Sequence, residues 1–178
     1  MVTKLEFFNV LERRRSVRSY KSQPVEEDKL RRIFEAANLA PSAGNLQAYH
    51  VYVFRERSKR EALAEAAHGQ TFIEQAPVCL VFCTDPSRCE SYGARGRELY
   101  SVQDATIAGS FAMLAAVDLG LSTVWVGDFD EDKVREIVGD KTGRPVAMFS
   151  VGYAAEEPHP SGRRAIEDLF SGDFPQTD

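Results

Sequence analysis

The chain has 178 residues, of which 43% are hydrophobic and 28% charged, and its formal net charge is −5. This length fits a single domain over residues 1–178, and an acidic balance argues against a general nucleic-acid-binding surface, which is normally basic. The apolar runs are too short to cross a membrane and the N-terminus lacks the pattern of a signal peptide, so we expect a cytoplasmic protein with no membrane partner.

Two helices and a strand are expected first. Hydrophobic residues recur at helical spacing over residues 4–14 and 26–40. The second helix must end at Ala40, because the residue before a proline, here Pro41, disfavours the α conformation. The segment HVYVF predicts a strand over residues 50–54.

Two short helices and a buried strand come next. A Ser or Thr followed three residues later by Glu has the spacing of a capping box, which opens a helix. The two pairs are Ser58 with Glu61 and Thr71 with Glu74. The continuous apolar run over residues 78–83 predicts a central strand, and a polar, turn-rich connection is expected over residues 85–97.

The longest expected helix covers residues 99–119. Its second half is nearly apolar all round, so we expect it to be buried. A strand over residues 122–127 follows, and Asp130 then caps a helix that ends at Gly139. Residues 145–153 form the last expected strand, before a loop and a single helical turn.

The order of these elements indicates the fold class. Strands and helices mix without strict βαβ alternation, which predicts a layered α+β sandwich rather than a doubly wound sheet. No Gly-rich dinucleotide fingerprint follows any expected strand.

An arginine run stands out on this acidic chain. RRRSVRSY, from Arg13 to Tyr20, places four arginines within six positions. The planar fork of an arginine matches phosphate oxygens, and a serine hydroxyl can add a contact. The same cations could instead stabilise the end of the first helix, although a helix end accounts for only one or two of them. The run itself leaves both interpretations open.

Three more segments carry polar groups suited to a ligand: PSAGNLQ at 41–47, WVGDFDEDKV at 125–134 and GRRAIEDL at 162–169. An amide such as that of Asn45 offers a donor and an acceptor together, and a glycine such as Gly127 lets a ligand approach the backbone closely. Each segment also has a plain structural interpretation, as a helix-ending turn, a strand-to-helix turn and an exposed pair of arginines.

Taken in order, the four segments resemble those of the nitroreductase family of small dimeric FMN enzymes. The resemblance implies a nitroreductase-like sandwich, with a mixed or antiparallel sheet flanked by helices and the long helix at the seam of a homodimer. It also implies an FMN-dependent oxidoreductase that uses NAD(P)H to reduce nitroaromatic or quinone-like acceptors by a ping-pong mechanism. Other flavin chemistry on the same fold, such as reductive dehalogenation or flavin cleavage, is an alternative. So is a non-enzymatic flavin- or nucleic-acid-binding module, although nucleic-acid modules interleave aromatic residues with the basic ones.

The resemblance assigns roles to residues of the arginine run and of the C-terminal segment. The run would contact the phosphate, the ribityl chain and the polar edge of the flavin ring. Its contributing residues are Arg14, Arg15, Ser16 and Arg18. Near the C-terminus, the resemblance favours Arg163 over Arg164 as the residue that closes on the phosphate.

Further roles follow from the same resemblance. The serine side of the 41–47 segment would reach the flavin of the other subunit, and Asn45 would hydrogen-bond the edge of the ring. The cofactor-binding residues expected in this segment are Pro41, Ser42, Ala43, Asn45 and Gln47. The backbone N–H groups of Gly127 and Asp128 would face flavin N5 and O4, with no catalytic side chain. An open acceptor pocket would be rimmed by Tyr92, Arg95, Arg97 and Tyr100.

No metal site is expected. Cys79, Cys83 and Cys89 lack the spacing of metal ligands and are better interpreted as buried free thiols. Trp125 lies in an expected core strand and is interpreted as a packing residue.

Overall fold

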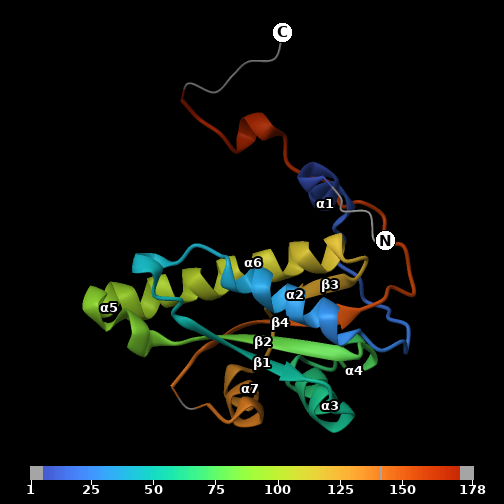
Figure 1. Cartoon of the computed structure of the whole chain (residues 1–178), viewed down its shortest axis with the longest axis horizontal. Helices are drawn as coiled ribbons and strands as arrows, with labels where there is room; N and C mark the ends of the chain where they lie inside the picture. Colours follow the sequence, from blue (N-terminus) through green and yellow to red (C-terminus); the bar gives the residue numbers. More distant parts are fainter. Residues whose placement is uncertain (1–5, 141, 173–178) are drawn as a thin grey trace.

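The structure is a computed structural model that describes residues 6–140 and 142–172. Its centre is a four-stranded sheet in the order β1-β2-β4-β3 (Figure 1). The strands are β1 (Tyr49–Phe54), β2 (Val78–Thr84), β3 (Ser122–Val126) and β4 (Pro145–Gly152). Each neighbouring pair is antiparallel, so the α+β prediction is confirmed and the sheet is antiparallel rather than mixed.

Helices cover both faces of this sheet (Figure 1). One face carries α2 (Glu27–Asn38) and α6 (Ser101–Asp118); the other carries α3 (Arg57–Ala66), α4 (Phe72–Gln75) and α7 (Glu131–Val138). Successive residues of a strand point to opposite faces, so β2 contributes Leu80 and Phe82 to the first layer and Cys79 and Val81 to the second. All seven residues of β2 are buried, as predicted for a central strand.

The long helix α6 is buried on one side only. Its inner face consists of small residues, which let the helix approach the sheet closely: Ala105, Ala108, Gly109, Ala112 and Ala116. The opposite side carries Phe111, which is 39% exposed. The prediction of a helix buried on all sides is therefore wrong for the single chain, because the sheet covers only one face.

Several local predictions needed correction. The two capping boxes are absent: α3 and α4 form as expected, but neither has a side-chain cap. Residues 85–97 are not a plain turn-rich connection but short helical turns, namely η2 (Pro86–Tyr92), α5 (Gly93–Arg95) and the π-turn η3 (Gly96–Tyr100). Asp130 does cap α7, accepting hydrogen bonds from the N–H groups of Asp132 and Lys133, and Gly139 ends that helix in the left-handed conformation.

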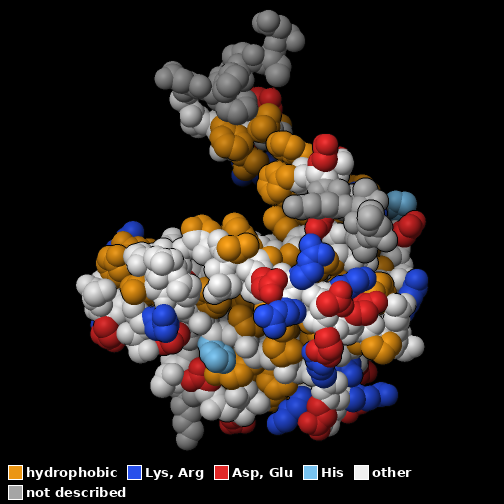
Figure 2. All heavy atoms as spheres, in the orientation of Figure 1, with side chains coloured by type: hydrophobic (Ala, Val, Ile, Leu, Met, Phe, Trp, Pro, Cys, Tyr) orange, Lys and Arg blue, Asp and Glu red, His pale blue; other side chains and the backbone are white. Residues whose placement is uncertain are grey.

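The first and the last described helical segments lie on the same side of the molecule, away from its body (Figure 1). The first helix, α1 (Phe7–Arg13), starts later than expected, and residues 4 and 5 lie outside the described part. The single C-terminal turn η4 (Ile166–Asp168) lies beyond it. Figure 2 shows hydrophobic side chains on these protruding segments, where Phe7 and Phe8 are 62% and 73% exposed. Within the described ranges no helix is long and apolar enough to span a membrane.

Candidate functional site

The arginine run leaves α1 as an extended segment beside β3. Arg14 has extended backbone angles, and its N–H donates the last helical bond to Val10 O. Ser16 then forms a parallel bridge with Thr123, and the Val17 N–H donates to Thr123 O at 3.1 Å. Since side chains alternate along an extended segment, Val17 enters the core at 3% exposure while Ser16 and Arg18 face the other way. The hydrophobic Val17 thus sets the direction of the polar residues.

The C-terminal segment returns to meet this run. Tyr20 forms an antiparallel bridge with Ala154, and the Ala155 N–H donates to Ser19 O at 2.9 Å. This short ladder brings residues 158–163 alongside the arginines, around a cavity of about 530 Å³. The predicted ligand residues that line it are Arg14, Arg15, Ser16, Arg18 and Arg163. Arg164 instead donates to Asp168 O at 2.8 Å and does not line the cavity.

The cations around this cavity lack carboxylate partners. Among the described residues, no carboxylate forms an ion pair with the guanidinium of Arg14, Arg15, Arg18 or Arg163. Arg15 donates to backbone carbonyls, Arg18 lies 6.0 Å from the ring centre of Phe72, and Glu156 accepts only the backbone N–H of Arg18. Burial lowers the pKa of Arg14, and the positive charges of Arg163 and Arg15 lower it further. Like charges held together in this way favour the binding of an anion.

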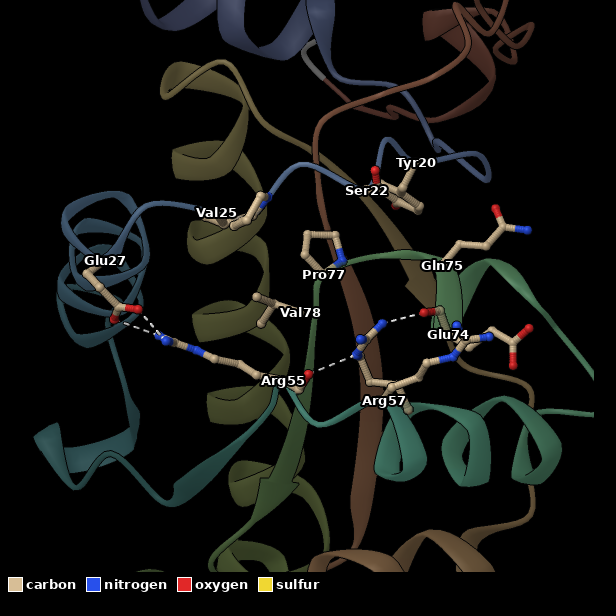
Figure 3. A pocket seen from close by; sticks show the side chains of 12 residues that line it. Tyr20, Ser22, Val25, Glu27, Arg55, Arg57, Glu74, Gln75, Pro77 and Val78 are labelled. Atoms are coloured by element: carbon tan, nitrogen blue, oxygen red, sulfur yellow. Dashed lines mark hydrogen bonds and ion pairs between the residues drawn. The ribbon is translucent and has the colours of Figure 1, made fainter.

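Another cavity, away from the arginine run, contrasts with this one (Figure 3). It has a volume of about 620 Å³ and is also lined by arginines, at positions 55, 57 and 60. Here the cations are already partnered: Arg55 pairs with Glu27, and Arg57 with Glu61. The third, Arg60, donates to backbone carbonyl groups and joins the start of β2 to α3. The arginines of this cavity serve the packing of the chain.

Gly127 and Asp128 lie at the end of β3 and are exposed. The Gln70 side chain donates to Asp128 O at 3.2 Å, and His68 Nε2 lies 3.4 Å from Asp128 Oδ1. Neither Gly127 nor Asp128 lines the arginine cavity. Gln70 stands two residues before Phe72, whose ring contacts Arg18. One short segment therefore borders both Asp128 and the arginine run. Gln70 could not be found from the sequence, because an isolated glutamine in a turn carries no pattern.

The 41–47 segment is a compact loop with its own hydrogen bonds. Gly44, Asn45 and Gln47 all have positive φ angles, between 46° and 57°. The Gln47 side chain donates to Ser42 Oγ at 3.1 Å and to Asn45 Oδ1 at 2.8 Å. Asp104, at the start of α6, accepts the N–H groups of Ala43 and Ala48.

Part of this loop borders a third cavity, of about 540 Å³. Pro41, Ser42 and Ala43 line it together with Tyr100 from the predicted rim. The other rim residues lie close by in the short helical turns. Tyr92 packs against Tyr100 in an edge-to-face arrangement at 5.4 Å between ring centres, and Arg95 Nε donates to Tyr100 Oη at 3.1 Å. Arg97 pairs with Glu90.

Most of the predicted site residues thus form two groups at opposite ends of α6 (Figure 1). Gly127 and Asp128 lie at the end of β3 and line neither cavity. The loop and the rim lie at its N-terminal end, where Asp104 accepts a hydrogen bond from the Ala43 N–H of the loop. The arginine run lies at its C-terminal end, where Val117 and Gly120 share a cavity with Arg13 and Arg15. A helix of 18 residues is about 27 Å long. One chain therefore does not bring the two groups together.

The cysteines and Trp125 lie in the core, where the sequence predicted them. The three cysteines are free and buried, as predicted, and burial raises the pKa of Cys83 to about 12. Trp125 packs on Phe149 at 4.9 Å between ring centres, which agrees with a packing role. His159, to which the sequence analysis gave no role, lines the arginine cavity.

On this antiparallel α+β fold, arginines converge on a cavity beside the edge strand β3, and their N–H donors suit an anionic ligand. Comparison with known proteins gives the family. The sequence profile of the nitroreductase family matches residues 11–74 and 67–153. The chain belongs to the nitroreductase family.

Individual relatives agree with this assignment. The chain is 33% identical to a protein named NADH dehydrogenase from Thermus thermophilus, over 87% of this chain and 90% of that protein. It is 37% identical to an FMN reductase [NAD(P)H] of Bacillus subtilis, over 64% of this chain and 50% of that protein. Among solved structures, the hypothetical oxidoreductase YcnD from Bacillus subtilis superposes with a TM-score of 0.88 at 30% identity, over 96% of this chain and 74% of that one.

Proposed function

We propose that this chain is an FMN-dependent oxidoreductase that uses NAD(P)H to reduce nitroaromatic or quinone-like acceptors. Its membership of the nitroreductase family supports this function, as does the Bacillus subtilis relative named FMN reductase [NAD(P)H]. We further propose a cytoplasmic location, because the three cysteines are free and a reducing compartment keeps thiols in that state.

The observation that carries the proposal is the set of arginines without carboxylate partners around the 530 Å³ cavity. A phosphate dianion fits this donor set, because guanidinium groups offer paired N–H donors and the charge of the phosphate offsets their mutual repulsion. Arg14, Ser16, Arg18 and Arg163 would hold the FMN phosphate, with Arg15 beside them. The position of Arg163 on the cavity wall favours it over Arg164 for this role.

The remaining predicted residues would position the ring. We assign the backbone N–H groups of Gly127 and Asp128 to the flavin edge at N5 and O4, and the amide of Asn45 to the uracil-like edge, where a donor and an acceptor are both needed. When bound, FMN supplies the capacity to accept a hydride from NAD(P)H and to pass electrons on. The protein itself binds, orients and shields, and it needs no side-chain nucleophile for this chemistry.

A second copy of the chain would complete the site. The 41–47 loop and the arginine cavity lie at opposite ends of α6, so a twofold axis across α6 would bring the loop of one subunit near the cavity of the other. The exposed apolar side of α6, with Phe111, supports this arrangement. So do the exposed hydrophobic residues of the protruding ends (Figure 2).

The test is cofactor binding by the purified protein. We expect FMN to bind at least about tenfold more tightly than riboflavin, because only FMN carries the phosphate. Arg18→Ala should release much of the FMN, whereas Arg55→Ala, which removes an arginine from the other cavity, should not. Equal affinity for riboflavin and FMN would refute the phosphate site, and a flavin-loaded protein that oxidises neither NADH nor NADPH would refute the proposed activity.

A further inference from the structure

The π-turn η3 places Arg95 over Tyr100. In an α-helix, residues five apart lie on different sides, but in a π-turn the hydrogen bond runs from i to i+5 and stacks them. The Ser101 N–H makes this bond to Gly96 O. The guanidinium of Arg95 consequently lies 5.5 Å from the Tyr100 ring centre, and Arg95 Nε donates to Tyr100 Oη. Gly96 is required here, because a Cβ at this position would lie 2.2 Å from Cys89 O.

The charge of Arg95 is not neutralised within the described part of the chain. Its side chain contacts the ring and the hydroxyl of Tyr100, and no described carboxylate pairs with it. Arg97, two residues later, differs because its Nη1 lies 3.2 Å from Glu90 Oε2. Both side chains are exposed and lie in the same turn. Of the two, only Arg95 has a charge without a described carboxylate partner.

The ring beneath Arg95 belongs to an aromatic pair that reaches the 41–47 loop. Tyr92 packs edge-to-face on Tyr100, and a Cβ at Gly44 would lie only 2.6 Å from Tyr92 Oη. Tyr100 itself lines the 540 Å³ cavity with Ser42 and Ala43. The free guanidinium, the aromatic faces and the loop therefore meet at one place.

We propose that Arg95 and Tyr100 form an anion-selective aromatic subsite, which makes planar acceptors bearing a carboxylate or sulfonate the preferred substrates. A planar ring packs against the tyrosines, and its anionic substituent accepts hydrogen bonds from the free Nη groups of Arg95. This inference rests on the proposed function, because it names the acceptor class of that same site.

The experiment compares 4-nitrobenzoate with neutral 4-nitrobenzamide as acceptors. For each variant, kcat/KM for the benzoate is divided by kcat/KM for the benzamide, and this ratio is compared with that of the wild type. The comparison removes the difference in intrinsic reactivity between the two compounds. We expect Arg95→Gln to lower this ratio about tenfold, mainly through KM for the benzoate, because a hydrogen-bonded charge pair is lost. Arg95→Lys should restore part of the preference. The control Arg31→Gln removes an exposed arginine that is already paired with Glu35 and lies outside the predicted rim, so it should change the ratio by less than about twofold.

A binding measurement independent of turnover accompanies the kinetics. Calorimetric titration of the purified protein with 2-naphthoate should show an affinity about tenfold lower in Arg95→Gln than in the wild type. An unchanged acceptor ratio, or a loss confined to reduction by NAD(P)H, would overturn the inference while leaving the proposed function in place. If neither acceptor is reduced, the proposed function fails instead, and the naphthoate titration still decides whether Arg95 selects anions.

Discussion

At the scale of single residues, one buried carboxylate determines the shape of the 41–47 loop. Asp104 is 2% exposed, and its two oxygens accept the N–H groups of Ala43 and Ala48 at 2.9 and 3.0 Å. These two residues flank Gly44, Asn45 and Gln47, whose positive φ angles are uncommon for residues with side chains. Asp104 thus holds both ends of a strained loop that carries predicted cofactor contacts.

Replacing this carboxylate should loosen the loop. In Asp104→Asn, an NH2 group replaces one of the two carboxylate oxygens. This NH2 group faces a backbone N–H and cannot accept a hydrogen bond from it. A buried donor is left without a partner, so we expect the free energy of unfolding to fall by about 2 kcal/mol. Urea denaturation measures the loss, and amide hydrogen exchange at Ala43 and Ala48 locates it.

The neighbouring Gln103→Ala serves as the control, because Gln103 is exposed on the same turn of α6. Unchanged exchange at Ala43 and Ala48 in Asp104→Asn would contradict the assigned role of the carboxylate.

At the scale of elements, α7 shows a helix end that the sequence predicts correctly. Asp130 Oδ1 accepts the N–H groups of Asp132 and Lys133, both at 3.1 Å, and so satisfies two groups that the helix itself leaves free. The two expected capping boxes failed for different reasons. The α3 helix starts one residue before Ser58, and Thr71 has α-helical backbone angles, which do not suit a cap.

The cap makes a measurable contribution to stability. We expect Asp130→Ala to lower the free energy of unfolding by about 1 kcal/mol, because the two N–H groups lose their acceptor. Glu136→Ala, an exposed position on the same helix, should have little effect. Thermal unfolding of the two variants side by side provides the comparison, and equal stabilities would show that the hydrogen bonds to Asp130 are replaced by water without cost.

At the scale of the whole molecule, the single chain leaves apolar surface uncovered. Leu39 is 76% exposed, Phe111 is 39% exposed, and the protruding ends expose Phe7, Phe8, Leu169 and Phe170. Large apolar patches on a small protein mark interaction sites. Together with the separation of the two site groups along α6, this surface supports the proposed homodimer.

Assembly can be tested by sedimentation. We expect the wild type to sediment as a dimer at micromolar concentration, since obligate interfaces bury upwards of about 2,000 Å². Phe111→Asp places a charge on the exposed side of α6 and should favour the monomer and reduce bound FMN, whereas Phe111→Tyr keeps an aromatic ring and should remain dimeric. A flavin-loaded, active monomer would rule out the proposed assembly.

The sequence by itself determined the features that depend on nearby residues. The β2 strand, the α7 cap at Asp130 and the buried cysteines follow from local hydrophobic pattern and from capping chemistry that acts within a few positions. The four ordered segments were enough to identify the family, because each is a short contiguous run of residues that can be recognised in the sequence. The α+β class follows from the order of the elements alone.

Only the tertiary structure decided which of these residues act together. It joined Arg14 and Arg18 to Arg163 through the ladder between Tyr20 and Ala154, and it showed that Arg55 and Arg60 are partnered while the arginine run is not. It also distinguished Arg95 from Arg97. In the π-turn Arg95 stacks on Tyr100, whereas Arg97 pairs with Glu90. Charge pairing and cavity shape depend on contacts between residues far apart in the chain, and no local pattern records those contacts.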